Sequence, residues 1–396
     1  MKMSIPFGRE VLELSVDLPE QRVIVAKSKA QRGTNTIEEL VREALDNPIG
    51  AKRMRDNRLR GKKVAILVDD KTRPTPARRI VSLVLDELKK AGSLSRDVFF
   101  VIATGLHTLD MPLPVVTEEQ QIEEKLGREI PSKYSVLTHD AYKPEKLRFI
   151  GFSKLGTPIW VNKDVFSADY RIAIGRICPH GDCGYEGGGK MVLPGISSLE
   201  TVMHNHRMFC SPNTGAGTLD ENPGRVDADD VGKIVGLDFI LNIVCGRSLQ
   251  SVEWVKGFAG DCLGAHRCGV EFGDKNVWGV AISEKADITI VSPGSGGIGS
   301  SYLHYAQQGT KPGGTVIYLA GEERPEVPMS SPPRWFFVRE ELRGVDLEET
   351  IRRQQQFKLV KPEDIFEMER ASAGVARRFN KHQNLVRVVG NSGGSE

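Results

Sequence analysis

Short apolar runs rich in Val and Ile alternate along the chain with segments whose apolar residues recur at helical spacing. Residues 63–68, 98–103 and 170–174 are runs of the length expected for buried strands, and a helix after the first of them is predicted to end near Lys90. Strands that alternate with helices are typical of α/β folds with largely parallel sheets. We therefore predict an α/β protein.

The same alternation restarts near residue 274. It predicts a strand at 287–292, a glycine loop, a helix at 300–308, a strand at 315–320 and helical segments near 346–356 and 362–378. A chain of 396 residues is also longer than the ~250–300 residues that one core usually holds. We predict two α/β domains, 1–273 and a smaller 274–396, with the active site in the cleft between them.

The composition narrows the class of protein. With 39% hydrophobic residues, 27% charged residues and a net charge of +2, the chain is typical of a soluble globular protein. No long basic run suggests nucleic acid as a partner, and neither a signal peptide nor a membrane span is expected. We expect a cytoplasmic protein, and a homo-oligomer is compatible with the sequence. The six cysteines include no Cys-x-x-Cys pair and are expected to be buried thiols.

Two glycine loops resemble nucleotide-binding signatures. The first, Gly184-x-x-x-x-Gly189-Lys190, fits a phosphate-binding loop except at its last position, where Met191 replaces the Ser or Thr that binds magnesium. The second, residues 294–299, matches the dinucleotide fingerprint and is followed by acidic residues at 322 and 323. An NAD-dependent 2-hydroxy acid dehydrogenase that uses this second loop is therefore an alternative function.

Polar side chains gather where the predicted strands end. Asp70, Thr72 and Arg73 follow the first strand, His107 follows the second, and His180 follows the third. The carboxyl edge of an open α/β sheet is where ligands bind, so these loops are expected to form a site. Arginine there can clamp a carboxylate or a phosphate, and two imidazoles with an ordinary pKa near ~6.5 can exchange protons with a substrate.

A lysine and a histidine complete the set of candidates. Lys190 follows three glycines, and a desolvated lysine can act as a nucleophile. His204 and His206 both lie in the predicted helix 198–209, but a spacing of two places them about 200° apart, so at most one faces a common site. Imidazole suits nickel among other borderline metals.

Five segments in one order, 70–76, 103–107, 179–190, 193–195 and 200–206, resemble the lactate racemase family, whose members use a nickel-pincer nucleotide. The resemblance extends from about residue 10 to the end and is weaker in the C-terminal unit. It implies a racemase or epimerase that inverts C2 of a 2-hydroxy acid by hydride transfer to and from the cofactor. Two bases are needed because the hydroxyl changes sides. A cofactor-free binding homologue of the same family is a further alternative.

The resemblance also implies roles for single residues. Lys190 is expected to hold the pyridinium-3-thioamide-5-thiocarboxylic acid mononucleotide nickel covalently, with His206 as the nickel ligand. His107 and His180 are the expected acid/base pair, and Arg73 the expected substrate-orienting residue. Further cofactor contacts are expected from Asp70, Thr72, Gly188, Gly189 and Gly296. Cofactor-maturation proteins are the implied partners.

One position departs from the family pattern. The resemblance leads us to expect a glutamine and a lysine three residues apart in the second domain, whereas the lysine position here is Gln308. Tyr305 and Gln308 are the expected substrate contacts from this domain. The lost positive charge favours a larger or sugar-derived 2-hydroxy acid over lactate.

Overall fold

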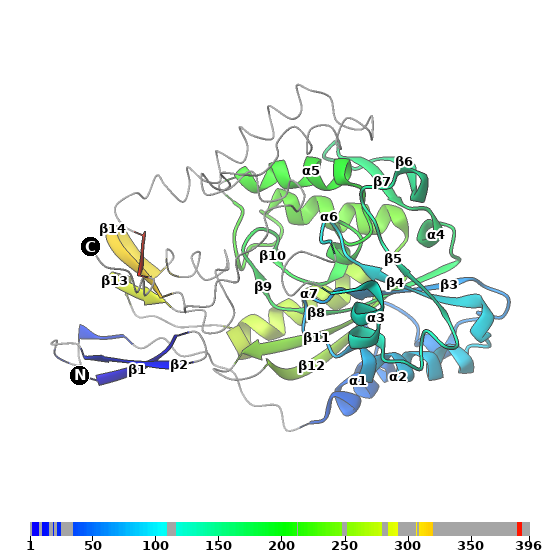
Figure 1. Cartoon of the computed structure of the whole chain (residues 1–396), viewed down its shortest axis with the longest axis horizontal. Coiled ribbons are helices and arrows are strands. Elements are labelled where there is room, and N and C mark those ends of the chain that lie inside the picture. Colours follow the sequence, from blue (N-terminus) through cyan, green and yellow to red (C-terminus); the bar gives the residue numbers. More distant parts are fainter. Residues whose placement is uncertain are drawn as a thin grey trace.

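The larger part of the chain is built on one six-stranded sheet (Figure 1). The computed structural model describes residues 2–7, 10–15, 19, 22–24, 35–108, 116–211, 213–247, 252–278, 284–291, 306, 309–319 and 386–389. In sheet order the strands are β12 (Val252–Gly260), β11 (Phe239–Arg247), β8 (Tyr170–Ile177), β3 (Val64–Asp69), β4 (Val98–Ala103) and β5 (Ser135–Thr138). All neighbours are parallel except β11 and β12. The prediction of an α/β fold with a largely parallel sheet is confirmed.

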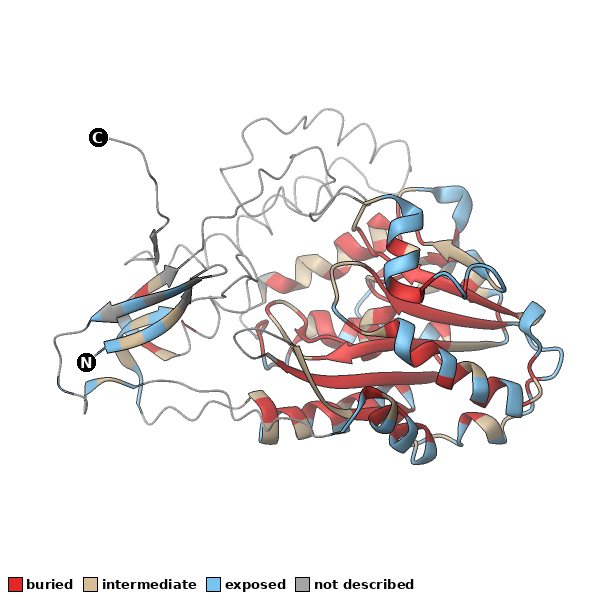
Figure 2. Ribbon diagram, turned by 60° about the horizontal axis from the view of Figure 1, so that its bottom comes forward, coloured by how far each residue is buried: buried red, intermediate tan, exposed pale blue. Residues whose placement is uncertain are grey.

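Helices cover both faces of this sheet. On one face lie α1 (Ile37–Asp46) and α2 (Ala77–Lys90), and α3 (Glu118–Leu126) adds its last residue to the same core. On the other face lie α5 (Leu199–Arg207), α6 (Pro223–Val235) and α7 (Cys262–Gly273). Because both faces are covered, the central strands β3 and β4 are buried along their whole length, whereas the edge strand β5 is not; buried segments are red in Figure 2.

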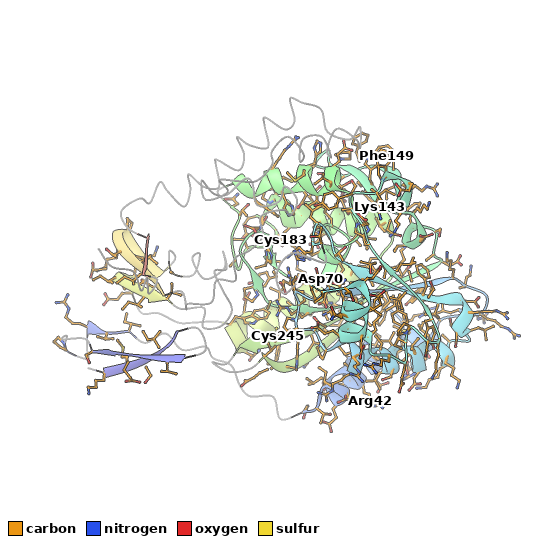
Figure 3. The ribbon with its side chains drawn as sticks, viewed as in Figure 1. Arg42, Asp70, Lys143, Phe149, Cys183 and Cys245 are labelled. Atoms are coloured by element: carbon orange, nitrogen blue, oxygen red, sulfur yellow. The ribbon has the colours of Figure 1, made fainter. Side chains whose placement is uncertain are left out.

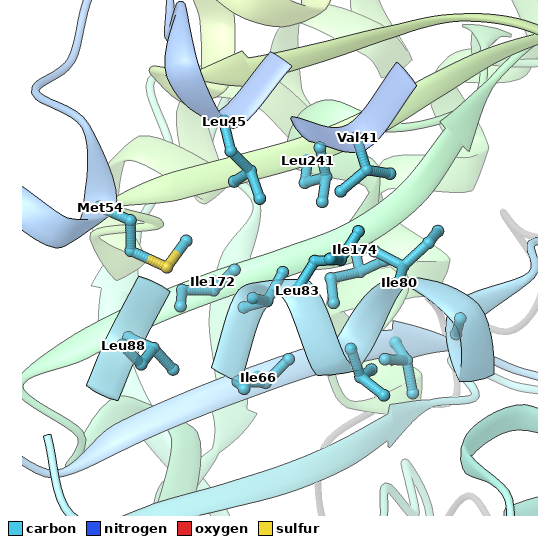
Figure 4. Close-up of a cluster of buried hydrophobic side chains, with 14 of the residues drawn as sticks. Val41, Leu45, Met54, Ile66, Ile80, Leu83, Leu88, Ile172, Ile174 and Leu241 are labelled. Atoms are coloured by element: carbon cyan, nitrogen blue, oxygen red, sulfur yellow. The ribbon is translucent and has the colours of Figure 1, made fainter. Parts of the chain in front are cut away.

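Alternate residues of each strand enter opposite cores. Ile66 packs under α1 and α2 with Ile80 and Val41 (Figure 4), whereas its neighbour Leu67 points to the opposite core. Each of these side chains is fully buried, which stabilises the fold by roughly 1.5–3 kcal/mol per residue. The apolar runs of the sequence are explained by this two-sided burial.

The remaining elements are small. Two hairpins pair β1 (Lys2–Phe7) with β2 (Glu10–Ser15) and β6 (Leu147–Phe152) with β7 (Pro158–Asn162), and the two-residue strands β9 (Pro179–His180) and β10 (Gly184–Tyr185) form a third pair. Short helices are α4 (Lys163–Phe166), η2 (Met54–Asp56), η3 (Ser95–Asp97), η4 (Pro144–Lys146), η5 (Gly188–Met191), η6 (Met208–Cys210) and the π-helical turn η7 (Asp274–Trp278). None of the helices that the structure describes combines the length and the apolarity that a bilayer crossing requires.

A second parallel sheet contains β13 (Ala286–Val291), β14 (Thr310–Leu319) and β15 (Val386–Val389). The first two strands correspond to those predicted at 287–292 and 315–320. The helices predicted at 346–356 and 362–378 lie outside the described residues, as does nearly all of 300–308. The division at residues 273 and 274 and the inter-domain cleft stay predictions.

The order of the strands places a topological switch point at β3. The chain runs from β3 through β4 to β5 on one side and later returns to β8 and β11 on the other. In open α/β sheets, ligands bind outside the carboxyl ends of the strands at such a point. The loops that follow β3, β4 and β8 carry the polar residues selected from the sequence, so the fold brings them to this edge.

Candidate active site

The first catalytic candidate, His107, is held by a buried carboxylate. Asp70 directly follows β3, and its Oδ2 lies 2.5 Å from His107 Nδ1. Thr72 donates its hydroxyl to the other carboxylate oxygen at 2.5 Å. Burial alone would raise the pKa of Asp70, but His107 and Arg73 hold it below its usual range. An ionised Asp70 accepts the Nδ1 proton, so neutral His107 keeps its lone pair on Nε2.

The guanidinium of Arg73 is fixed at two of its nitrogens. Nη1 donates to Thr72 Oγ1 at 2.5 Å, and Nε pairs with Glu186 Oε1 at 2.7 Å. The carbonyl oxygen of Arg73 accepts a bond from Lys125 Nζ at 2.6 Å, and this buried lysine also pairs with Asp69. The buried Lys125 thereby holds the backbone of the loop after β3, while the Arg73 side chain stays 24% exposed.

Glu186, which the sequence reasoning missed, joins two arginines. Its Oε2 accepts a bond from Arg176 Nε at 2.5 Å and one from the Cys178 thiol at 3.2 Å, while Oε1 faces Arg73. Burial would raise the pKa of Glu186, but Arg176 and Arg73 hold it well below its usual range. A lone acid within a glycine-rich loop was the available signal for this residue.

His180 lies in the tight hairpin of β9 and β10. The backbone N–H groups of Asp182 and Cys183 donate to His180 Nδ1 at 3.2 and 3.3 Å. Because a backbone N–H can only donate, the proton of neutral His180 is on Nε2, the opposite arrangement to His107. Burial and then the nearby Lys190 lower the pKa of His180 well below its ordinary value.

Lys190 is carried by the glycine loop and the turn η5. The loop needs its glycines, because a Cβ on Gly188, whose φ is +59°, would lie 2.7 Å from Arg225 Nη2. A Cβ on Gly189 would lie 2.4 Å from the carbonyl oxygen of Ala228 in α6. Burial lowers the pKa of the Lys190 amine, and Arg73 acts in the same direction. The lysine that follows is therefore disposed to act as a nucleophile.

The glycine loop is supported by a second set of residues, which were not predicted as site residues from the sequence. The fully buried Arg225 donates to the carbonyl oxygens of Tyr185 and Gly187 at 3.2 and 3.1 Å and pairs with Asp229 at 2.5 Å. His266 Nε2 donates to the carbonyl oxygen of Glu186 at 2.9 Å. The i, i+4 spacing of Arg225 and Asp229 on one helix was the available signal.

His206 lies on α5, which begins after the N-cap Ser198. The amide Nδ2 of Asn205 donates to Gly224 and Asp227, so its Oδ1 accepts from His206 Nδ1 at 3.2 Å. The lone pair of neutral His206 is then on Nε2, the form in which imidazole binds metals. Burial and then Lys190 lower the pKa of His206 to about 3. No group of three or more His, Cys, Asp or Glu side chains within the described ranges is placed to hold a metal by itself.

These groups form one electrostatic neighbourhood. The charges of Lys190, Glu186, Arg73 and His206 all affect the pKa of His180. Asp70 and His107 join the set through Thr72 and Arg73. Asp70 and Cys183, labelled in Figure 3, lie in the interior of the larger unit, whereas Phe149 lies at its margin. Gly296, Tyr305 and Gln308 lie outside the described residues.

The chain is similar to named racemases over most of its length. A family model described as the lactate racemase N-terminal domain matches residues 7–217. The lactate racemase of Thermoanaerobacterium thermosaccharolyticum is 33% identical over 297 residues, which cover 74% of this chain and 66% of that protein. The lactate racemase of Lactiplantibacillus plantarum is 28% identical over 329 residues, which cover 81% of this chain and 74% of that protein. The chain thus spans about two thirds of the first relative and about three quarters of the second.

Solved structures agree with these similarities. The lactate racemase apoprotein from Thermoanaerobacterium thermosaccharolyticum superimposes on this chain with a TM-score of 0.71 and 30% sequence identity. The matched region covers 95% of this chain and 86% of the apoprotein chain. A structural-genomics protein from Thermotoga maritima shares the fold, with a TM-score of 0.52 and 20% sequence identity. That match covers 73% of this chain and 72% of the Thermotoga maritima chain. Because the family model matches more than half of the sequence, the chain belongs to the lactate racemase family, whose named members are isomerases.

Proposed function

We propose that the chain is a racemase or epimerase that inverts C2 of a 2-hydroxy acid, with His107 and His180 as its two acid/base groups. The observation that carries the proposal is the opposite hydrogen bonding of the two imidazoles at Nδ1, which implies opposite tautomers. His107 has a lone pair on Nε2, set by Asp70, and His180 has a proton on Nε2, set by two backbone N–H groups. Inversion needs one group that takes the hydroxyl proton and another that gives one back.

The chain's own residues have simple tasks in this reaction. His107 takes the hydroxyl proton at Nε2, and Asp70 stabilises the imidazolium that forms. His180 faces the substrate oxygen with Nε2 from the other side; it gives a proton from Nε2 when it enters that step as the imidazolium, and the two histidines exchange roles in the reverse direction. Arg73, whose Nε and Nη1 are held by Glu186 and Thr72, orients the substrate carboxylate.

The residues present fit a nickel-pincer nucleotide attached at Lys190. The Lys190 amine is buried with a lowered pKa, and the glycines before it let a ligand approach the backbone. Neutral His206 offers one nitrogen, which suffices for a metal whose other ligands come from the pincer. When bound, this group would supply the chemistry of a hydride acceptor and donor beside C2 of the substrate. We assign Asp70, Thr72, Gly188, Gly189 and Gly296 to its surroundings.

The remaining parts of this proposal concern the choice of substrate, the location in the cell and the delivery of the cofactor. Tyr305 and Gln308 are proposed to contact the substrate from a second domain, 274–396, across a cleft. Gln308, where the family pattern has lysine, favours a larger or sugar-derived acid over lactate. We propose a cytoplasmic protein that receives its cofactor from maturation proteins. The dehydrogenase alternative rests on residues 294–299, which lie outside the described residues.

A turnover assay tests the proposed function. The protein, co-expressed with cofactor-making proteins, is incubated with single enantiomers of a panel of 2-hydroxy acids that includes lactate, and the products are separated on a chiral column. We expect conversion toward a mixture of enantiomers, with a loss of at least about 10²-fold in His107→Asn and His180→Asn. The buried His139, whose Nε2 donates to Ser197, provides the control variant His139→Gln. Reduction of free NAD by the acids, without inversion, would establish the dehydrogenase instead.

A further inference from the structure

Glu186 occupies an unusual position, because one buried carboxylate faces two arginines, one from a loop and one from a strand. Arg73 follows β3 and reaches Oε1 at 2.7 Å, and Arg176 lies on β8 and reaches Oε2 at 2.5 Å. The carboxylate has little freedom to move. The backbone N–H of Glu186 donates to the Cys178 carbonyl oxygen at 2.8 Å, and its own carbonyl oxygen accepts from His266 at 2.9 Å.

The contacts of Arg73 show what this bridge achieves. Its Nε is used by Glu186 and its Nη1 by Thr72, while Nη2 has no hydrogen-bond partner among the described residues. An ion pair at Nε and a hydrogen bond at Nη1 restrict rotation of the guanidinium, which favours one direction for Nη2. Arg176, with a side chain only 8% exposed, is shielded and holds the far side of Glu186.

The charges of the three groups also matter. Two guanidinium groups and one carboxylate carry a net charge of +1, and the ionised Asp70 also acts on Arg73. Without Glu186, Arg73 and Arg176 would repel each other in a desolvated setting, where unpaired charges are costly.

We propose that Glu186 is a positioning residue: its carboxylate fixes the guanidinium of Arg73 so that it can receive a substrate carboxylate. This inference rests on the proposed function, in which Arg73 orients the substrate. It assigns no chemical step to Glu186 itself.

The test is the reactivity of Arg73 toward phenylglyoxal, measured by peptide mass spectrometry and normalised to the exposed Arg53. In Glu186→Gln one carboxylate oxygen becomes an NH₂ group that faces a guanidinium, so we expect Arg73 to react about tenfold faster. Cys178→Ser keeps a donor toward the same carboxylate and is expected to leave the rate unchanged. If Glu186→Gln does not fold, Glu186→Asp keeps the charge on a shorter side chain and is expected to give an intermediate rate. An unchanged Arg73 rate in either folded Glu186 variant would overturn the inference.

Turnover of the loaded enzyme separates this inference from the proposed function. We expect Glu186→Gln to raise KM for the 2-hydroxy acid about tenfold with a smaller change in kcat, and Glu186→Asp to restore part of the loss. A wild-type protein that never inverts a 2-hydroxy acid refutes the proposed function but leaves the phenylglyoxal result to decide how Arg73 is held. An active wild type with unchanged KM in Glu186→Gln refutes the positioning role alone.

Discussion

Asp70 shows how one buried charge can hold a neighbouring imidazole in one hydrogen-bonded arrangement. Its carboxylate accepts from His107 Nδ1 and Thr72 Oγ1, and both bonds depend on its being ionised. Asp70→Asn would remove the charge that stabilises an imidazolium, so we expect kcat/KM to fall by at least about 10²-fold. The matched control is Asp46→Asn, whose carboxylate pairs with Arg55 in a more exposed setting. Equal activity in the two variants would contradict the role of Asp70.

The same carboxylate makes a prediction about acid stability. The pKa of Asp70 is lower in the folded chain than its unfolded value of about 3.9. The unfolded chain therefore takes up this proton first as the pH falls, and the contribution of Asp70 to stability is present above about pH 4 and lost below it. We expect the difference in unfolding free energy between wild type and Asp70→Asn to shrink below pH 4 in urea titrations. A difference that stays constant would contradict the paired carboxylate.

Residue types at strand ends were enough to select Arg73, His107, His180 and Lys190, because loops after apolar runs are visible in the sequence. Glu186 and Arg225 were missed. Glu186 pairs with Arg73 from the loop after β3, and Arg225 bonds to the backbone of the glycine loop, so these contacts are decided by the tertiary structure; only the pairing of Arg225 with Asp229 follows from spacing. Buried polar pairs of this kind have no local signature beyond an isolated charge in an apolar or glycine-rich segment.

At the scale of elements, the glycine loop before Lys190 depends on Gly188. Gly188→Ala would force a Cβ against Arg225 and His266 at a φ of +59°, so we expect the unfolding free energy to fall by about 2 kcal/mol or more. Gly61 is the matched control, because it has a φ of +72° but a Cβ added there would have no heavy atom within 4 Å. Gly61→Ala should cost only the backbone term of about 1 kcal/mol. Equal losses in chemical denaturation would show that the packing under the loop is unimportant.

The histidine at the end of β5 links that strand to the turn before α5. His139 Nε2 donates to the carbonyl oxygen of Ser197 at 3.0 Å, and burial lowers the pKa of His139 to about 4. Because the unfolded residue binds a proton below about pH 6.5, stability is expected to fall as the pH drops from about 6.5 to 4. The part due to His139 is on the order of 3 kcal/mol. This part is absent from His139→Gln, so the difference in unfolding free energy between wild type and the variant should shrink by that amount as the pH falls from about 6.5 to 4. A difference independent of pH would contradict the prediction.

At the scale of the whole molecule, the alternation of strands and helices predicted the α/β class, and the strands β3, β4 and β8 were located within a few residues. The order of the strands could not be predicted, because pairing of β3 with β8 joins segments about a hundred residues apart. That pairing creates the switch point and brings the loops at Asp70 and His180 to one edge. Most residues of the candidate site could therefore be predicted from the sequence, but their arrangement at one edge of the sheet could not.

The central claim, a cofactor attached at Lys190 with nickel bound by His206, is tested most directly by intact mass spectrometry combined with nickel analysis. The wild type, Lys190→Ala and the control Lys233→Ala are each co-expressed with cofactor-making proteins. We predict a mass increase located at Lys190 and about one nickel per chain in the wild type and in Lys233→Ala, with the mass increase lost in Lys190→Ala. An unmodified Lys190 peptide without nickel, from cells that load a known lactate racemase, would contradict the claim.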